Sequence, residues 1–338
     1  MKLRIGINGA GRVGRCVLRA WQKHPYASVV AINDLTDAET LAYLVRHDSV
    51  HGAFPNTVQQ KSRSLTIGDE TVSLYQEKDP TAIPWQDHGV DVVLECTGAL
   101  TDASLARAHL RPGGVRKVII SAPAKSPDVT LVIGANLGAY DAGKHHVISN
   151  GSCTTNCLAV VAKVFLEQFG IVSGLMTTIH SYTNDQRLLD LPHKDFRRTR
   201  AAALSMIPTT TGAAKTIGEV LPALRGKLDG YALRVPTPNV SLLDLNLTLE
   251  KPATAVQINQ AFVEAASSAA YKGILGTTQE PLVSCDFQGS TFSAVVDLLS
   301  TQVVGNQAKI LAWYDNEMGY STRLYELAGL ILAGKDRP

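Results

Sequence analysis

The sequence predicts an α/β protein made of two domains. Its 338 residues are long enough for two domains of roughly 150 residues each. The first half contains several short and nearly continuous apolar runs, which are typical of strands covered by helices on both faces. The second half contains longer segments in which apolar and polar residues alternate, such as residues 241–249, and these also indicate strands.

The composition excludes several classes of function. With 32 basic and 30 acidic residues the net charge is +2, and no long run of like charge occurs. The chain therefore lacks the basic surface of a nucleic-acid-binding protein, although small charged ligands can still find local sites. No apolar run reaches the roughly 18 residues that a membrane span needs, and the first residues enter a strand pattern in place of a signal peptide. We therefore expect a cytoplasmic protein with no nucleic-acid or membrane partner.

A glycine motif follows the first predicted strand, residues 3–8. The motif is Gly9-Ala10-Gly11-Arg12-Val13-Gly14, and a helical pattern begins within it. This is G-x-G-x-x-G between a strand and a helix, the arrangement of a Rossmann-type dinucleotide site. The first glycine allows a tight turn, the second lets the backbone approach a pyrophosphate, and the third lets helix pack on strand. A plain tight turn is the alternative; the predicted cofactor contacts here are Asn8, Gly9 and Gly11.

A second predicted strand, residues 29–34, ends in a carboxylate. Asp34 lies twenty positions after Gly14. An acidic residue at this place accepts a hydrogen bond from a ribose 2′-hydroxyl and repels a 2′-phosphate. The sequence therefore predicts NAD in preference to NADP, with a helix cap or turn as the alternative role of Asp34.

Further apolar runs at 90–95, 117–121, 131–134 and 146–149 are predicted strands of the same sheet. Ligands on such sheets collect at the carboxyl ends of the strands. Thr97, Gly98 and Ser121 lie at these ends, so they are either neighbours of the cofactor or simple turn residues.

The stretch SNGSCTTNC, residues 149–157, lies where a predicted strand gives way to a helix that starts near Thr154. Ser152 is a suitable N-cap, which leaves Cys153 at or beside the helix N-terminus. A helix N-terminus together with a nearby His⁺ or Lys lowers a thiol pKa to roughly 3.5–7.5 from about 8.5. Cys157, one turn further, lacks that help. The sequence thus favours Cys153 as a nucleophile.

A zinc site and a disulfide are two less well supported roles for this cysteine pair. A zinc site needs two more closely spaced ligands, and neighbouring His145 and His146 point to opposite faces of a strand. A disulfide between Cys153 and Cys157 would distort the helix. We therefore predict no metal, and we expect Cys16, Cys96 and Cys285 to be small apolar residues of the core.

The second half contains groups suited to a cysteine nucleophile and to phosphate. His180 ends an alternating strand at 175–180 and is either a base for the cysteine or an unremarkable histidine. Arginines at 197, 198 and 200 and the turn T-T-T-G at 209–212 suit phosphate oxygens, with a solvated basic patch and a helix cap as alternatives. Arg234 lies among apolar neighbours and so needs a partner anion.

The whole chain resembles the phosphorylating glyceraldehyde-3-phosphate dehydrogenases. The resemblance is carried by I-N-G-x-G-R-V-G-R at the start, S-N-x-S-C-T-T-N-C at 149–157, H-S-Y-T-N-D-Q at 180–186, R-R-T-R-A-A at 197–202, T-T-T-G-A-A-K at 209–215, R-V-P-T-P-N-V at 234–240 and D-N-E-x-G-Y at 315–320. Gly151 stands where the family usually has alanine, and Met318 where it usually has tryptophan.

The resemblance implies a reaction and a set of site residues. Cys153 would be the nucleophile and His180 the base in the oxidation of glyceraldehyde 3-phosphate by NAD, and inorganic phosphate would release the thioester as 1,3-bisphosphoglycerate. Thr183 and Arg234 would hold the substrate phosphate, and Arg198 the substrate, with Arg197 and Arg200 as neighbouring alternatives. The attacking phosphate would contact Ser152, Thr154, Thr211 and Gly212. The matching cofactor contacts are Arg12, Val13, Asp34, Lys78, Ser121 and Asn316.

The resemblance also implies the domain organisation. Residues 1–150, completed by 316–338, would form the Rossmann-type NAD-binding domain. Residues 151–315 would form an α+β catalytic domain with a mostly antiparallel sheet. The segment 182–203 would cross to a neighbouring subunit of a homotetramer. Two alternatives remain at this point, an erythrose-4-phosphate dehydrogenase and a non-enzymatic NAD-binding paralogue.

Overall fold

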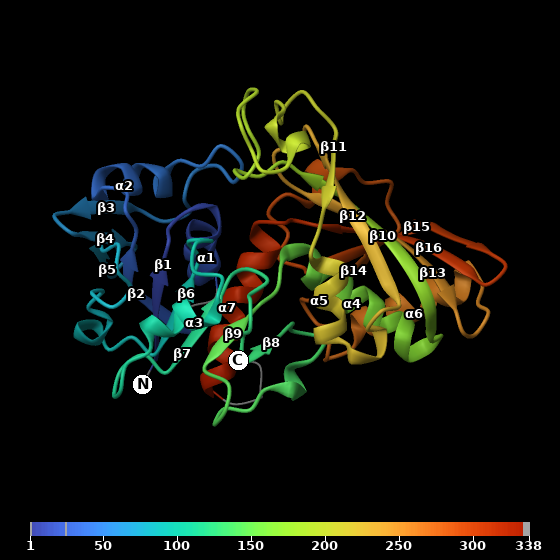
Figure 1. The fold of residues 1–338 in the computed structure, drawn as a ribbon, viewed down its shortest axis with the longest axis horizontal. Helices are drawn as coiled ribbons and strands as arrows, with labels where there is room; N and C mark the ends of the chain where they lie inside the picture. Colours follow the sequence, from blue (N-terminus) through green and yellow to red (C-terminus); the bar gives the residue numbers. More distant parts are fainter. Residues whose placement is uncertain (1, 24–25, 334–338) are drawn as a thin grey trace. The chain divides into compact units, whose positions relative to one another are not determined.

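The structure is a computed structural model that describes residues 2–23 and 26–333 (Figure 1). The chain folds as two compact units. The first comprises Met1–Leu131, Leu137–Gly151 and Ser321–Pro338, and the second comprises Val132–Asn136 and Ser152–Tyr320. Each unit is built on one sheet. No helix among the described residues is long and apolar enough to span a membrane.

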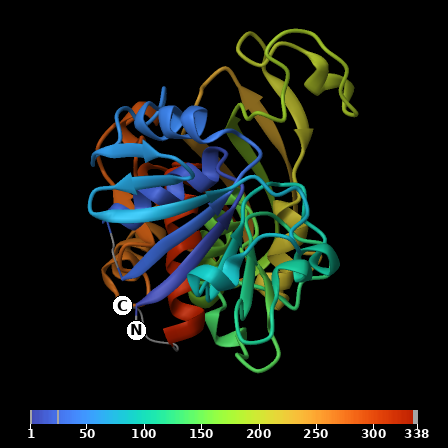
Figure 2. The same cartoon turned by 90° about the vertical axis from the view of Figure 1, so that its left-hand side faces the viewer.

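The sheet of the first unit has nine strands in the order β3-β4-β5-β2-β1-β6-β7-β9-β8. Its strands pair in parallel from β5 to β8, and only the β3-β4-β5 meander at one edge, light blue in Figure 2, is antiparallel. The strands are β1 Leu3–Asn8, β2 Ala27–Asn33, β3 Val58–Lys61, β4 Ser64–Ile67, β5 Glu70–Tyr75, β6 Val92–Glu95, β7 Lys117–Ile120, β8 Val129–Thr130 and β9 Val147–Ser149. The predicted α/β unit with a largely parallel sheet is confirmed.

Burial in this sheet follows from the continuous apolar runs. Every residue of β2, β6 and β7 is buried. The helices of the unit are α1 Arg12–Lys23, α2 Ala38–Arg46, the short α3 Ala103–Ala106 and the C-terminal part of α7 Met318–Ala333. Tyr325 of α7 donates its hydroxyl to the carbonyl of Ala27 at 3.1 Å, which fastens that helix to β2.

One predicted strand of this sheet is wrong. Residues 131–134 form a turn, and the strand β8 ends at Thr130. Gly134 has a positive φ of 85°, and the Asn136 side chain accepts a hydrogen bond from the Val132 amide at 2.8 Å. A side chain that satisfies a backbone amide in this way favours a turn over a strand.

The sheet of the second unit has seven strands in the order β11-β12-β10-β13-β16-β15-β14. Four of its six pairings are antiparallel, so the predicted mostly antiparallel sheet is confirmed. The strands are β10 Ile171–Ser181, β11 Ile207–Thr210, β12 Leu228–Val235, β13 Ser241–Leu249, β14 Leu275–Thr278, β15 Ala294–Val304 and β16 Gln307–Tyr314.

Three helices, α4 Cys153–Gln168, α5 Ala213–Val220 and α6 Ala255–Ser267, pack against one face of this sheet (Figure 1). Alternate residues of β13 and β16 are buried, as the alternating sequence predicts. On the helices, Phe165 of α4 meets Phe262 of α6 edge to face, with ring centroids 5.3 Å apart. This face is therefore the core of the second unit.

The pairing of β10 with β12 determines the geometry of the site. These strands run parallel, and their register places His180 opposite Arg234. Both residues lie near the carboxyl ends of their strands, where β10 ends at Ser181 and β12 at Val235.

The same pairing supplies a test of the fold. Gly230 of β12 pairs with Met176 of β10, and a Cβ on Gly230 would lie 2.0 Å from the Met176 carbonyl oxygen. Because a backbone atom on a central strand has little room to move, we expect Gly230→Ala to destabilise the protein by about 1–3 kcal/mol. Gly138→Ala is the control, since a Cβ there meets no atom within 4 Å. Urea unfolding midpoints measure both, and equal midpoints would contradict this packing.

Candidate active site

The turn before α4 places Cys153 at the first position of the helix. Ser152 has extended φ and ψ of −118° and 170°, and its hydroxyl oxygen accepts a hydrogen bond from the Thr155 amide at 3.0 Å. This is the predicted N-cap. Gly151 has a φ of 61°, in the left-handed region that glycine adopts without steric cost. An alanine there would cost roughly 1 kcal/mol, so glycine suits the backbone of this chain at that turn.

Cys153 lies against His180. The Sγ of Cys153 is 3.4 Å from Nε2 of His180, a residue only 4% exposed. Nδ1 of His180 lies 2.7 Å from the Ser181 carbonyl oxygen and 2.6 Å from Nη1 of Arg234. The parallel register of β10 and β12 and the start of α4 thus bring together three residues that the sequence analysis proposed separately.

Burial is the largest influence on the charge states of this group. It raises the pKa of the Cys153 thiol, while Arg234 and the hydroxyl and amide of Thr154 act to lower it. It also lowers the pKa of His180 to about 3, with Arg234 as the second cause. The lowered thiol pKa expected from the helix N-terminus is thus outweighed by burial. Burial thus favours the neutral thiol and the neutral imidazole, and a proton transferred along the 3.4 Å contact would create the two charges side by side.

Cys157 is a different kind of cysteine. It is fully buried in α4, and burial raises its pKa well above the ordinary value. All five cysteines are free thiols. Cys16 is buried as expected, but Cys96 is only partly buried and Cys285 is exposed, so the prediction of three core cysteines is wrong for Cys285. Cys285 lies in a short 3₁₀ turn, Ser284–Phe287, whose buried residue is Phe287.

Tyr314 is a residue of this site that the sequence did not single out. Its hydroxyl is hydrogen-bonded to Thr154 at 2.9 Å and to Thr178 at 2.7 Å, and its ring meets His180 edge-on. The Thr154 side chain, from a residue 3% exposed, is thereby engaged inside the protein. The only signal in the sequence was the position of Tyr314 directly before the D-N-E-x-G-Y motif.

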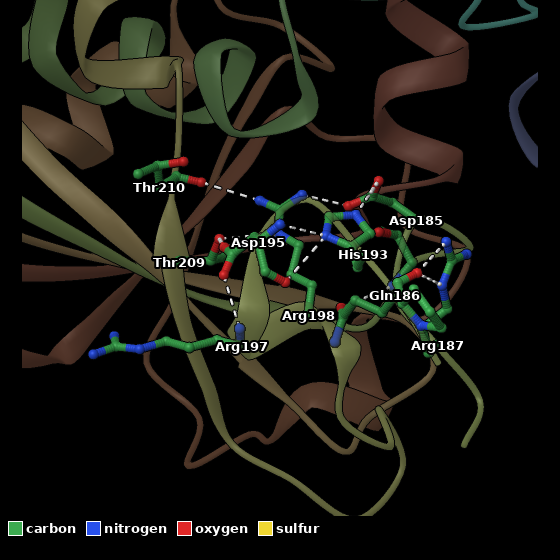
Figure 3. A network of polar contacts seen from close by, with 11 residues as sticks. Asp185, Gln186, Arg187, His193, Asp195, Arg197, Arg198, Thr209 and Thr210 are labelled. Carbon is green, nitrogen blue, oxygen red and sulfur yellow. Dashed lines mark hydrogen bonds and ion pairs between the residues drawn. The ribbon is translucent and has the colours of Figure 1, made fainter. Parts of the chain in front are cut away.

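Arg198 is the anchored member of the arginine cluster (Figure 3). Its Nε donates to the Thr209 hydroxyl at 2.9 Å, its Nη1 is paired with Asp185, and its Nη2 donates to the Thr210 carbonyl at 3.3 Å. Thr209 in turn donates to Asp195 at 2.7 Å. Arg197 and Arg200 are exposed. The fixed position of Arg198 favours it over its neighbours as a ligand-binding arginine.

The remaining polar positions of this unit lie at turns and helix ends. Thr211 accepts a hydrogen bond from the Ala213 amide at 3.3 Å, and the exposed Gly212 precedes the first turn of α5. The Thr183 amide donates to the Gln186 side chain at 3.2 Å. Among these positions, Arg234 gives the clearest indication of a ligand. Its Nε is buried and has no acceptor among the described residues. A buried N–H donor without an acceptor is suited to bind an anion.

In the first unit, the three glycines of the motif have the surroundings that a dinucleotide site requires. Gly9 has a φ of 94°, and a Cβ there would lie 2.6 Å from the Thr97 amide nitrogen. A Cβ on Gly14 would lie 2.2 Å from the Gly9 carbonyl oxygen, whereas Gly11 faces open space. The first and third glycines therefore permit close packing, and the second leaves room for a ligand. These residues fit an NAD pyrophosphate.

Asp34 lies at the same loop. Its two carboxylate oxygens accept hydrogen bonds from the Ala10 amide at 2.6 Å and the Thr36 amide at 2.8 Å. The half-buried carboxylate is thus held at the end of β2 beside the glycine turn.

A buried hydrogen-bond network holds this loop in place. Asn8, only 4% exposed, donates to Glu95 at 2.6 Å, and Glu95 also accepts from the Thr97 amide at 2.9 Å and from His109 at 3.0 Å. The Trp85 indole donates to Nδ1 of His109 at 3.2 Å, so the proton of a neutral His109 lies on Nε2. The Asn8 side chain therefore holds the loop and is not free for a ligand. Sequence reasoning missed Glu95 and His109.

The other predicted cofactor residues are placed as follows. Thr97, Gly98 and Ser121 follow the adjacent strands β6 and β7, as expected. Arg12 in the first turn of α1 forms an ion pair with Asp48 at 2.8 Å. Val13 is partly buried and Lys78 is exposed. Asn316 belongs to the second unit, between β16 and α7.

Comparison with known proteins gives a consistent result over both units. The family model for the glyceraldehyde 3-phosphate dehydrogenase NAD binding domain matches residues 3–103, and that for the C-terminal domain matches residues 152–316. The chain is 55% identical over 332 residues to the glyceraldehyde-3-phosphate dehydrogenase of Geobacillus stearothermophilus, covering 98% of each chain. It is 56% identical over 326 residues to glyceraldehyde-3-phosphate dehydrogenase 1 of Bacillus cereus, covering 96% of this chain and 97% of the relative.

The geometry predicts which thiols react. At neutral pH we expect iodoacetamide to label Cys153 and the exposed Cys285 while Cys157 stays protected. Because Nε2 of His180 lies where it can accept the thiol proton, His180→Asn should slow labelling of Cys153 at least about tenfold. Cys285 is the internal control, and its rate should not change. Peptide mass spectrometry over time measures all three thiols.

Two results would contradict this geometry. One is labelling of Cys157 ahead of Cys153. The other is an unchanged ratio of Cys153 to Cys285 labelling in the His180→Asn variant.

Proposed function

Since the chain belongs to the glyceraldehyde-3-phosphate dehydrogenase family, we propose that Cys153 and His180 form its catalytic pair. The family assignment makes the protein an NAD-dependent oxidoreductase that acts on glyceraldehyde 3-phosphate and inorganic phosphate. The observation that carries the proposed mechanism is the 3.4 Å contact between the Cys153 sulfur and Nε2 of His180.

The first step is attack of the Cys153 sulfur on the aldehyde carbon. The thiol proton passes to Nε2 of His180 and then to the aldehyde oxygen, which gives a hemithioacetal. His180 next removes the hydroxyl proton while the hydride leaves the former aldehyde carbon, and a thioester on Cys153 remains. Bound NAD supplies the acceptor for that hydride. Inorganic phosphate then displaces the thiolate, so the product is 1,3-bisphosphoglycerate.

Two groups of residues are proposed for the two anions of this reaction. Arg234 and Thr183 bind the phosphate of the substrate, which supplies the acceptor that the buried Nε of Arg234 lacks. Arg198 binds the substrate from its anchored position. We assign the attacking phosphate to Ser152, Thr154, Thr211 and Gly212, where Gly212 exposes the start of α5. The hydroxyl of Thr154 is bonded to Tyr314, so Thr154 would serve this site from its buried position.

We assign the cofactor to residues of the glycine loop and the strand ends. The support comes from the open space at Gly11 and from the carboxylate of Asp34 beside that loop. Asn8 contributes by holding the loop through Glu95. The proposed set is Asn8, Gly9, Gly11, Arg12, Val13, Asp34, Lys78, Thr97, Gly98, Ser121 and Asn316. The proposed NAD-binding domain is residues 1–150 with 316–338, and the proposed catalytic domain is residues 151–315. These bounds differ from the two compact units at 132–136 and 316–320, which belong to the second unit. We place the enzyme in the cytoplasm.

A homotetramer is proposed on the basis of apolar side chains that the described residues leave exposed. Leu188, Phe196 and Leu204 of the segment after β10 are 81%, 87% and 81% exposed. Apolar side chains grouped in this way mark an interface between protein chains.

The oligomeric state is measurable by light scattering on the eluting protein. We expect four times the chain mass of 36.2 kDa. A Leu188→Glu, Phe196→Glu double variant should shift the protein to smaller species, because it places charges in the interface. Leu105→Glu, at an exposed leucine of α3, is the control and should remain tetrameric. A monomeric wild-type protein would refute the proposal.

A steady-state assay tests the proposed reaction. Continuous NADH formation should require both glyceraldehyde 3-phosphate and inorganic phosphate, because without phosphate each site can be acylated only once. The kcat/KM for this aldehyde should exceed that for erythrose 4-phosphate by at least about tenfold. A preference for the tetrose would favour an erythrose-4-phosphate dehydrogenase. NAD binding without any reduction would favour a non-enzymatic paralogue.

A further inference from the structure

The side-chain amide of Asn316 is held by two buried serines. Asn316 is 8% exposed and lies between the end of β16 and the start of α7. Its Oδ1 accepts hydrogen bonds from the Ser181 hydroxyl at 2.7 Å and from the Ser241 hydroxyl at 2.9 Å. Ser181 and Ser241 are 0% and 1% exposed, and they come from the neighbouring strands β10 and β13.

These contacts determine which way the amide points. Ser241 also accepts a hydrogen bond from the Ser181 amide at 3.2 Å. With Oδ1 facing the serines, both hydroxyl hydrogens have an acceptor. With the amide reversed, Nδ2 would face them, and only one hydroxyl hydrogen could find an acceptor, namely the other hydroxyl oxygen 3.4 Å away. A buried hydroxyl without an acceptor is costly, so Oδ1 faces inward and Nδ2 faces outward.

The backbone on either side of this amide is also fixed. The carboxylate of Asp315, 1% exposed, accepts from the Gly289 amide at 2.7 Å and from Nδ2 of Asn239 at 2.9 Å. It also caps α7 by accepting from the Glu317 and Met318 amides at 2.9 Å and 2.8 Å. Asn316 therefore presents a fixed donor, and Nδ2 has no acceptor among the described residues.

We propose that Ser181 and Ser241 are positioning residues that make Asn316 a donor for the carboxamide oxygen of the nicotinamide. That oxygen belongs to the only carbonyl group of NAD, so a fixed amide donor distinguishes the nicotinamide end from the rest of the dinucleotide. Ser181 follows His180 directly, so the same strand end holds the base and orients the donor. The inference rests on the proposed assignment of Asn316 to the cofactor.

The two serine hydroxyls keep the Asn316 side chain from rotating. Loss of both hydroxyls removes the two donors that hold Oδ1, and the amide becomes free to rotate and present its oxygen to the carboxamide oxygen. Two oxygen acceptors repel each other, so binding of the nicotinamide is weakened. The adenosine and pyrophosphate parts of the ligand do not depend on this amide.

The test compares two ligands by isothermal titration calorimetry, NAD and ADP-ribose, which lacks the nicotinamide. We expect the Ser181→Ala, Ser241→Ala double variant to weaken NAD about tenfold and ADP-ribose less than about twofold. Ser241→Thr, which keeps a hydroxyl, should restore most of the loss in the Ser241→Ala single variant. Ser293→Ala is the matched control, because Ser293 is a buried serine whose hydroxyl has no partner among the described residues.

The Asn316→Ala variant tests the assignment of Asn316 to the cofactor separately from the positioning role of the two serines. If that variant lowers NAD affinity relative to ADP-ribose while the double serine variant does not, the positioning role is wrong and the cofactor assignment stands. If Asn316→Ala leaves the ratio of the two affinities unchanged, the assignment of Asn316 to the cofactor fails and the inference fails with it. Equal weakening of both ligands in the double variant would show general damage to the fold and would also overturn the positioning role.

Discussion

The parallel pairing of β10 with β12 is the constraint on which the catalytic unit depends. It sets His180 opposite Arg234, and the N-terminus of α4 places Cys153 against the same histidine. The left-handed glycine at 151 and the cap at Ser152 fix where that helix begins. The geometry of this turn thus places the Cys153 sulfur within hydrogen-bonding distance of the histidine that we propose as its base.

Burial governs the chemistry of this pair as much as proximity does. It disfavours a thiolate on Cys153 and an imidazolium on His180, so the neutral pair is favoured until an anion or a substrate changes the site. Arg234 acts on both groups, since its positive charge favours the thiolate and disfavours the imidazolium. An anion that binds Arg234 would relieve the second effect, which makes the substrate phosphate a part of the electrostatics of the site.

The sequence predicted features that depend on local pattern. The glycine turn, Asp34 at a strand end and Ser152 as a cap all follow from residues close in the chain. The bonds of Asn8 to Glu95 and of the two serines to Asn316 join residues between 75 and 135 positions apart. His109 bonds to Glu95 from 14 positions away, in a segment outside the sheet. No local pattern marks such partners, because their identity depends on which strands become neighbours. The wrongly predicted strand at 131–134 shows the opposite limit of local pattern. The apolar run predicted a strand, but the side chain of Asn136 and the positive φ of Gly134 form a turn there.

Whether Cys153 carries the acyl group can be measured from the mass of a trapped intermediate. The protein is mixed with NAD and glyceraldehyde 3-phosphate without inorganic phosphate, quenched in acid and mapped by peptide mass spectrometry. We expect a phosphoglyceroyl adduct on Cys153 that disappears when phosphate is added before the quench. The adduct should be absent in Cys153→Ser and should persist in Cys157→Ser. An adduct on Cys157, or none on Cys153 while NADH forms, would contradict the proposed role of Cys153.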